Sequence, residues 1–346
     1  MSEKDILLDV RDLAFSFHTY AGEVQAVRGV SFKIERGKCL GIVGESGCGK
    51  SVTAKSLIGL NPGKPVGELK QGEILFDGKD LAKISEKEMR KVRAQEIRMI
   101  FQDPMTCLNP TMTIGRQILE GICKYGDKCK EEAKKITLET LTLAGISSPE
   151  ERFKQYPHEL SGGMRQRVMI ALAMAVNPKL LIADEPTTAL DVTIQAQILE
   201  LIKDIQKHYD TSIIMITHDL GVVANIADEI AVMYAGKILE YGQVEDIFEF
   251  PAHPYTWGVL QSIPPEDMTD RQPLSPILGT PPDLIRPPKA CPFAARCPYT
   301  MKICSAQQPP VYSCNGTDHR VACWLYHPKA MPVKNPFTGQ EVMKHE

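Results

Sequence analysis

The segment Gly44 to Ser51 carries the clearest chemistry in the sequence, because it reads Gly-Glu-Ser-Gly-Cys-Gly-Lys-Ser. This matches the phosphate-binding pattern G-x-x-x-x-G-K-S/T, whose glycines let backbone N–H groups turn toward phosphate oxygens. Lys50 would supply a positive charge to the β- and γ-phosphates, and Ser51 would offer a hydroxyl to Mg²⁺. The segment therefore predicts a nucleoside triphosphate and Mg²⁺ as ligands.

Two acidic residues, Asp184 and Glu185, end a later apolar run that begins at Leu180. At the end of a buried strand, Asp184 could hold Mg²⁺ through water. Glu185 could be the base that polarises an attacking water. A solvated acidic turn before Pro186 is the plain alternative, but the phosphate-binding loop favours a hydrolytic site.

Gln102 and His218 each follow an apolar run, just past the predicted end of a buried strand. Ligands bind at this edge of open α/β sheets. Gln102 could therefore touch Mg²⁺ and the attacking water, and His218 the γ-phosphate. Taken singly, each residue would more often be an ordinary loop residue.

A second glycine-containing segment, Leu160 to Gln166, reads Leu-Ser-Gly-Gly-Met-Arg-Gln. The residues after it, 164–176, contain no Gly or Pro and predict a helix that starts at this segment. The start of a helix presents free N–H groups and the positive end of its dipole, so a phosphate would suit it.

The elements that must position these residues form an alternating pattern over the first 250 residues. Short apolar runs separated by helical patterns predict a largely parallel sheet that is covered on both faces. The predicted strands are 39–43, 98–101, 180–183 and 212–217, with a hairpin strand and turn at 230–237, and the predicted helices include 52–60 and 130–145. Residues from about 103 to 165 predict a helical subdomain inserted into this pattern.

Composition limits the class of protein. The chain has 346 residues, a net charge of −3 and no apolar run near the ~20 residues that cross a bilayer. The charge gives no basic field that would favour nucleic acid as a partner. The first residues do not have the layout of a secretory signal, so we expect a cytosolic protein.

The sequence changes character near residue 250. Seventeen of the 25 prolines lie from Pro251 onward, and five of the ten cysteines lie between Cys291 and Cys323. Dense proline prevents long helices and central strands. We therefore expect two parts, residues 1–250 and an irregular, loop-rich extension over 251–346 that needs a staple to hold its shape.

The order of these motifs over residues 5–250 resembles the ATP-binding cassettes of ABC transporters. The resemblance implies an α/β fold, the ABC-type P-loop NTPase cassette, with a RecA-like core, an antiparallel β subdomain and a helical subdomain. It also adds an aromatic residue that stacks on adenine, for which we choose Phe17 over Phe15 and Tyr20. The implied ATP-binding residues are Phe17, Gly44, Ser46, Gly47, Cys48, Gly49, Lys50, Ser51 and Val52, with Ser51, Gln102 and Asp184 at Mg²⁺ and Glu185, His218 and Gln102 in catalysis.

The same resemblance implies that two cassettes sandwich ATP head to tail. Ser161 and Gly163 would then contact the γ-phosphate held by the partner chain, and Asp191 would couple the two sites. A signature helix on a separate subdomain is poorly placed to reach its own nucleotide, which agrees with this arrangement. The signature residues are Leu160, Ser161, Gly162, Gly163, Met164, Arg165 and Gln166, and the coupling segment is Ala189, Leu190 and Asp191.

The segment 253–265, which begins His-Pro-Tyr-Thr-Trp, resembles the C-terminal signature of oligopeptide and dipeptide importer ATPases, a group that includes nickel importers. Four thiolates of the extension can close a metal or cluster site, and their spacing alone leaves Zn²⁺ and iron–sulfur about even. The resemblance favours a 4Fe–4S cluster, as a structural staple in preference to a redox sensor. The implied ligands are Cys291, Cys297, Cys304 and Cys323, with Cys314 outside the pattern.

Within this group the chain resembles the D-type subunit. The resemblance implies a heterodimer with an F-type ATPase subunit, two integral-membrane permease subunits and an extracytoplasmic substrate-binding protein. The chain would then lie on the cytoplasmic face of the membrane as a peripheral subunit. The alternatives are a nickel-chelate importer, a soluble ABC ATPase that acts on nucleic acid or ribosomes, and a silent regulatory cassette; Glu185 and His218 argue against the last.

Overall fold

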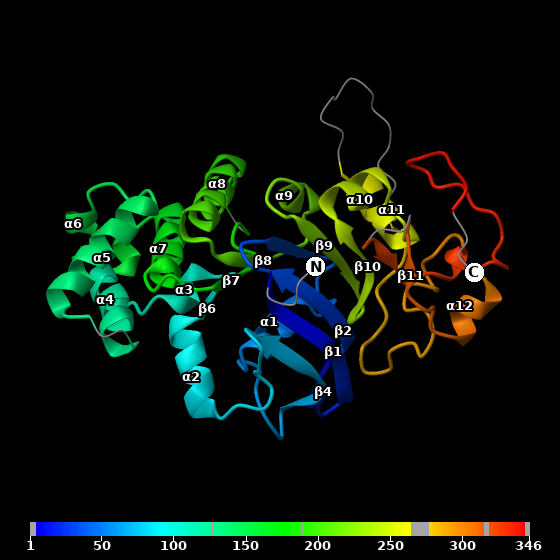
Figure 1. Ribbon diagram of the computed structural model, residues 1–346, viewed down its shortest axis with the longest axis horizontal. Helices are drawn as coiled ribbons and strands as arrows, with labels where there is room; N and C mark the ends of the chain where they lie inside the picture. Colours follow the sequence, from blue (N-terminus) through cyan, green and yellow to red (C-terminus); the bar gives the residue numbers. More distant parts are fainter. Residues whose placement is uncertain (1–4, 126–127, 189, 264–276, 315–317, 343–346) are drawn as a thin grey trace.

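The computed structural model describes residues 5–125, 128–188, 190–263, 277–314 and 318–342. Figure 1 shows a lobe of helices on one side, two sheets in the middle and the C-terminal extension on the other side. The nucleotide motifs lie on the middle part and, for the signature segment, on a helix of the helical lobe.

The larger sheet has eight strands, and its central strands are buried along their whole length. The five strands β9, β3, β8, β7 and β6 pair in parallel, whereas β10, β12 and β11 add antiparallel pairs at one edge. In order across the sheet the strands are β11 (Tyr312–Ser313), β12 (Arg320–Val321), β10 (Lys237–Gln243), β9 (Glu229–Tyr234), β3 (Cys39–Val43), β8 (Ser212–Thr217), β7 (Leu180–Asp184) and β6 (Ile97–Ile100).

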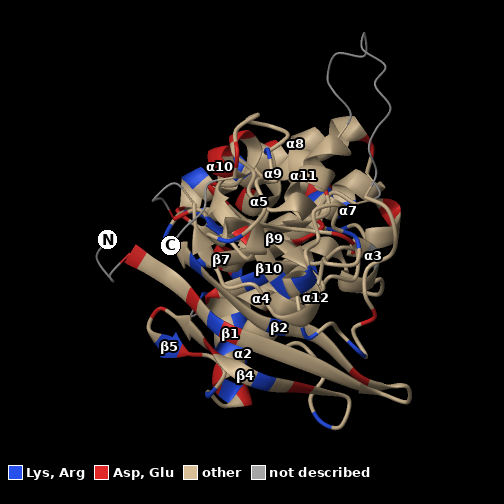
Figure 2. Cartoon of the chain, turned by 90° about the vertical axis from the view of Figure 1, so that its right-hand side faces the viewer, with Lys and Arg blue, Asp and Glu red and all other residues tan. Residues whose placement is uncertain are grey.

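The smaller sheet is antiparallel and has four strands in the order β2-β1-β4-β5. Its apolar face and the helix α1 (Lys50–Leu57), which follows β3, share one core with the larger sheet, so the two sheets are packed together. The strands are β1 (Ile6–Thr19), β2 (Gly22–Glu35), β4 (Gly67–Phe76) and β5 (Lys79–Asp80). In Figure 2, both basic and acidic residues lie on the strands of this sheet.

The helical lobe has a second core of its own, which it shares with the neighbouring strands β7 and β8. Its elements are α3 (Pro104–Cys107), α4 (Ile114–Tyr125), α5 (Lys130–Leu143), α6 (Pro149–Arg152), the short 3₁₀ helix Pro157–Glu159 and α7 (Gly162–Met174). The other helices of the first 250 residues are α1 (Lys50–Leu57), α2 (Glu86–Gln95), α8 (Val192–Tyr209), α9 (Leu220–Ala224) and α10 (Val244–Glu249).

The predicted strands are all present, with bounds shifted by about one residue. The turn between β9 and β10 places Ala235 and Gly236 at φ of 47° and 79°, as a tight hairpin requires. The signature helix α7 begins at Gly162, two residues before the predicted start, because the Ser161 side chain caps it by accepting from the backbone N–H of Met164.

The C-terminal extension is more ordered than its proline content predicts. It contains α11 (Pro254–Gln261), α12 (Lys302–Ala306), the 3₁₀ helix Trp324–Tyr326 and the strands β11 and β12. Because β12 pairs with β10, the extension continues the larger sheet in place of forming only a loop-rich appendage. Two-residue strands are too short to produce an alternating pattern, which is why the sequence did not reveal them.

Candidate functional site

The phosphate-binding loop connects β3 to α1, and its glycines are needed because other backbone lies close to it. A Cβ at Gly44 would collide with the carbonyl oxygen of Met233, and one at Gly49 with that of Ala26. Gly47, at φ 77°, faces open space, and Ser46 beside it is exposed. The loop is therefore pressed against β9 and β2 on one side and open on the other.

Lys50 is buried and is held by the loop itself. Its Nζ donates to the carbonyl oxygens of Gly44 at 2.6 Å and Glu45 at 3.1 Å. The ammonium group is thus already placed at the mouth of the loop, where a triphosphate would compete with these carbonyls for it. Cys48 is buried, and burial raises the pKa of its thiol, so it is an inert part of the loop.

The two residues predicted to hold Mg²⁺ from the loop and from β7 lie together. Ser51 Oγ donates to Asp184 Oδ1 at 2.8 Å. Asp184 is almost fully buried, and burial raises the pKa of its carboxyl group although the Ser51 hydroxyl opposes this. A hydroxyl and a carboxylate at this distance are oxygen donors of the kind that Mg²⁺ prefers.

Glu185 is surrounded by the polar side chains that the sequence singled out. Its carboxylate accepts from Gln102 Nε2 at 3.0 Å and lies 3.4 Å from His218 Nδ1. Thr188, which sequence reasoning missed, donates from Oγ1 to the same carboxylate at 2.9 Å. The backbone of Glu185 has a φ of 48°, an uncommon conformation for this residue type that recurs at functional sites.

These residues come from the carboxyl ends of four neighbouring parallel strands, β3, β6, β7 and β8. Gln102 follows β6, Asp184 and Glu185 end β7, and His218 follows β8. The topology thus brings together side chains as far apart in the chain as Ser51 and His218, which are 167 positions apart.

The signature segment divides into an exposed part and a buried part. Ser161 and Gly162 are exposed, and Gly163, Met164 and Arg165 are half-buried. Leu160 and Gln166 are buried, and Gln166 Nε2 donates to the carbonyl oxygen of Pro186 at 2.5 Å. Gln166 therefore fastens the signature helix to the turn after β7 within the same chain, which leaves the serine and glycine end free for another molecule.

The predicted coupling segment is described in part. Ala189 lies outside the described residues, and Leu190 is half-buried. Asp191 is exposed and caps α8 by accepting from the N–H of Ile194 at 2.9 Å.

The candidates for adenine stacking differ in exposure. Phe15 is buried, Phe17 is half-buried and meets Phe15 edge to face at 5.1 Å, and Tyr20 is fully exposed. Phe17 remains our prediction. Val52, in the first turn of α1, is half-buried.

The four cysteines predicted to bind a metal lie in one region of the extension. The N–H of Cys291 donates to the carbonyl oxygen of Cys304 at 3.0 Å. Burial raises the pKa of Cys323, and the neighbouring Cys297, Cys291 and Cys304 raise it further. All ten cysteines are free thiols. Among the described residues, however, no group of three or more His, Cys, Asp or Glu side chains is placed to hold a metal ion.

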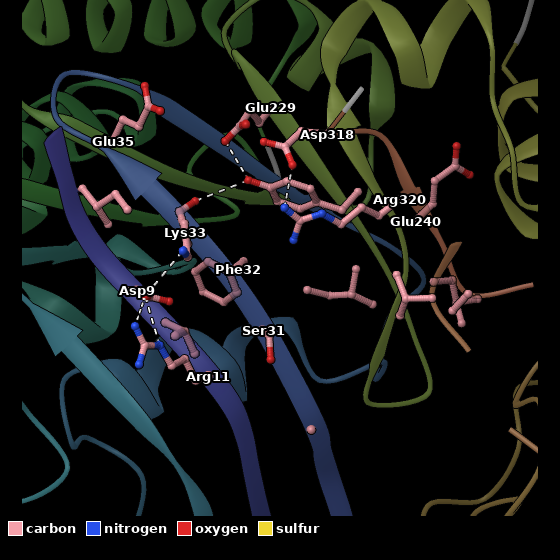
Figure 3. A pocket seen from close by; sticks show the side chains of 18 of the residues that line it. Asp9, Arg11, Ser31, Phe32, Lys33, Glu35, Glu229, Glu240, Asp318 and Arg320 are labelled. Carbon is pink, nitrogen blue, oxygen red and sulfur yellow. Dashed lines mark hydrogen bonds and ion pairs between the residues drawn. The ribbon is translucent and has the colours of Figure 1, made fainter. Parts of the chain in front are cut away.

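A cavity of about 550 Å³ lies between the smaller sheet and strand β10 of the larger one, bordered by the extension (Figure 3). Its wall carries charged side chains that are already paired, such as Arg11 with Asp9 and Arg320 with Asp318. None of the nucleotide motifs lines it, so this cavity is separate from the predicted site.

No helix within the described parts of the chain is both long enough and apolar enough to span a membrane.

Comparisons with known proteins agree with this geometry. The ABC transporter family matches residues 27–188, and the C-terminal region of oligopeptide/dipeptide transporters matches residues 239–304. The chain is 61% identical over 330 residues to the oligopeptide transport ATP-binding protein OppD of Bacillus subtilis, covering 95% of this chain and 92% of the relative. It is 55% identical over 324 residues to the dipeptide transport ATP-binding protein DppD of the same organism, covering 94% and 96%.

Among solved structures, a dimeric bacterial ABC transporter cassette is similar with a TM-score of 0.61 and 26% identity, covering 68% of this chain and 98% of that one. This agrees with the ABC cassette fold and its antiparallel β subdomain. The share of the chain left uncovered is about the size of the C-terminal extension. The chain therefore belongs to the family of ATP-binding proteins of oligopeptide and dipeptide ABC transporters.

Proposed function

We propose that the chain hydrolyses ATP to power the import of peptides, at a site that it completes together with a second ATPase chain. The observation that carries this is the convergence of Gln102 and His218 on Glu185, next to the Ser51–Asp184 pair. A base, a metal-binding pair and a phosphate-binding loop at one sheet edge are the parts that ATP hydrolysis needs.

In this proposal each group of the chain has one task. Glu185 accepts the proton of the attacking water, while Gln102 and Thr188 keep its carboxylate aimed, and His218 contacts the γ-phosphate. Lys50 leaves the carbonyls of Gly44 and Glu45 and turns to the phosphates. Ser51 and Asp184 would hold Mg²⁺, which neutralises charge on the β- and γ-oxygens when it is bound.

The second chain is proposed because Ser161 and Gly162 are exposed while Gln166 fixes the rest of the signature within its own chain. An exposed helix start with free N–H groups suits a phosphate held by another cassette. The similar solved cassette is dimeric. We infer a non-identical F-type ATPase subunit as the partner, two permease subunits above the pair, an extracytoplasmic binding protein, and a peripheral location on the cytoplasmic face of the membrane.

The test of the peptide assignment is ATP hydrolysis in vesicles that contain the assembled transporter and its binding protein. Di- and oligopeptides should stimulate hydrolysis, and Lys50→Ala in this chain should abolish the stimulation because the phosphates lose their charged partner. Stimulation by nickel chelates but not by peptides would favour the alternative cargo. A lack of stimulation by any solute would contradict an importer function.

We also propose that Cys291, Cys297, Cys304 and Cys323 hold a 4Fe–4S cluster as a staple of the extension. The four thiols lie near enough to affect one another's pKa, which supports a shared site, and the resemblance to peptide-importer ATPases favours a cluster over Zn²⁺. Iron and sulfide analysis of anaerobically purified protein tests this. About four of each per chain is the expected result, and zinc without sulfide would refute it.

A further inference from the structure

Arg296 lies in the cysteine segment of the extension but reaches the phosphate-binding loop. Its Nη1 donates to both carboxylate oxygens of Glu45, each at 2.9 Å, and to Tyr234 Oη at 3.2 Å. Its Nε and Nη2 donate to the carbonyl oxygens of Leu278 at 3.0 Å and Ile277 at 3.2 Å. The guanidinium group thus fastens two segments of the extension to the loop.

This contact is shielded from water. The Arg296 side chain is only 7% exposed and that of Glu45 is 29% exposed. The guanidinium carbon of Arg296 also lies 5.7 Å from the centre of the Tyr234 ring. An ion pair with one nearly buried partner is screened less by salt than a surface pair, so its effect on nearby charges is larger.

The backbone of Glu45 is held as well. Its N–H donates to Tyr255 Oη at 3.0 Å, and its carbonyl oxygen accepts from Lys50 Nζ. Tyr255 is fully buried and belongs to α11 of the extension. The extension therefore contacts both the side chain and the main chain of one residue in the loop.

Glu45 is the one carboxylate in the loop 44–51. A triphosphate bound by this loop would lie well within the Debye length, about 8 Å at physiological salt, of that negative charge. An uncompensated Glu45 would repel it, and a carboxylate that could move would also leave the loop less preorganised. Arg296 counters both effects.

We propose that Arg296 is a positioning residue for ATP binding: it neutralises Glu45 and fixes the phosphate-binding loop, so that ATP affinity depends on the docked extension. The proposed role of Arg296 rests on the ATP site described above and requires no metal at the cysteines.

The experiment compares Arg296→Ala, Glu45→Gln and the double variant in the assembled transporter. Arg296→Ala should raise the KM for ATP about tenfold, the loss expected for one charge-assisted hydrogen bond, with little change in kcat. Glu45→Gln alone should change the KM less than Arg296→Ala does, because it removes the repelling charge while its amide oxygen can still accept from Arg296. Adding Glu45→Gln to Arg296→Ala should restore most of the affinity, because the charge that Arg296 no longer neutralises is then absent. Arg320→Ala is the matched control, because it removes an arginine–aspartate pair of the extension that lies away from the loop.

Salt separates charge neutralisation from a merely structural role. The defect of Arg296→Ala should shrink as ionic strength rises, since screening weakens the repulsion by Glu45. A KM unchanged by Arg296→Ala would overturn the proposal, and so would a defect that neither salt nor Glu45→Gln relieves. Binding of a fluorescent ATP analogue to the full chain compares the ATP affinity of the same variants without hydrolysis. If the assembled protein hydrolyses no ATP, this measurement still tests the role of Arg296, so the two proposals can fail separately.

Discussion

Glu185 is the residue on which the proposed chemistry depends, and three side chains from different elements contact its carboxylate. Its left-handed backbone, at φ 48°, is fixed by the N–H···O bond from Glu185 to Ile216 at 2.9 Å. A base held this firmly is already oriented toward the water that must attack the γ-phosphate from one direction.

Thr188→Val removes one of these three contacts and nearly preserves the shape of the side chain. We expect kcat for ATP hydrolysis to fall about tenfold, because one hydrogen bond that orients the base is lost, with little change in the KM for ATP. Steady-state ATPase assays on the assembled transporter measure this. Thr188→Ser keeps the hydroxyl and should retain activity, and wild-type kcat in Thr188→Val would show that Thr188 does not orient the base.

His253 provides a prediction about pH. It is fully buried, and burial lowers the pKa of its imidazole to about 3, while its Nδ1 accepts from the N–H of Tyr255 at 2.9 Å. In the unfolded chain, His253 has an ordinary pKa near 6.5 and takes up a proton below that pH. In the folded chain it stays neutral down to a much lower pH. Stability should fall as pH falls from about 6.5 toward 3, because protons favour the unfolded state.

His253→Asn keeps an acceptor for the start of α11 but cannot titrate. Its stability should fall less steeply with acid than that of the wild type, by up to about 1.4 kcal/mol per pH unit. Urea unfolding at several pH values between 6.5 and 4.5 measures the two slopes. His158→Asn, at an exposed position, should behave like the wild type; equal slopes for His253→Asn would show that His253 is not the buried neutral group described here.

Residue types and spacing singled out most of the side chains that the structure brings together at the candidate site, since each motif carries its own local pattern. Thr188 was missed because its role depends on the tight turn after β7, and Arg296 because it meets Glu45 across 251 positions of the chain. No local pattern records such a contact. The sequence also contained no sign that one end of the signature is exposed while Gln166 is buried, because burial is decided by the three-dimensional fold.

At the scale of elements, β10 joins the cassette to the extension through Glu240, whose side chain is fully buried. Its carboxylate accepts from the N–H groups of Ala252 and His253 at 2.6 and 2.8 Å, from Thr256 Oγ1 at 2.5 Å, and lies 2.8 Å from His319 Nε2. A buried carboxylate needs such donors to offset the loss of water. Glu240 is thus the link between β10, the start of α11 and the segment before β12.

Glu240→Gln should destabilise the protein by about 3 kcal/mol, because the amide cannot accept from all of these donors and loses the charge. Chemical denaturation of the full chain measures the change. Glu245→Gln, on the exposed side of α10, is the matched control and should change stability by less than about 0.5 kcal/mol. A similar small change in Glu240→Gln would mean that the extension is held mainly by its apolar contacts.

The long elements were predictable and the short ones were not. Apolar runs and helix-forming stretches predicted β3, β7, β8 and α5 within one or two residues, because a buried parallel strand and a long helix produce strong patterns. The strands β11 and β12 have two residues each and form only because β10 offers a free edge. Their existence depends on tertiary pairing.

At the scale of the whole molecule, we propose that the chain forms only part of a complete ATP site and that a second chain supplies the rest. The extension contacts the phosphate-binding loop from behind, while Ser161 and Gly162 of the signature are exposed on the helical lobe. We infer that closing two such chains around ATP, and opening them after hydrolysis, is the motion that drives transport.

The most direct test of this shared site is Glu185→Gln, which removes the base and leaves the other contacts to ATP and Mg²⁺ in place. Gel filtration of the purified ATPase pair with and without Mg²⁺ and ATP, alongside an assay of ATP turnover, gives the result. We predict that the variant binds ATP, loses turnover at the site of this chain and elutes as a closed pair that persists only with ATP. Undiminished ATP hydrolysis by the variant, with no ATP-dependent pair, would contradict the shared site.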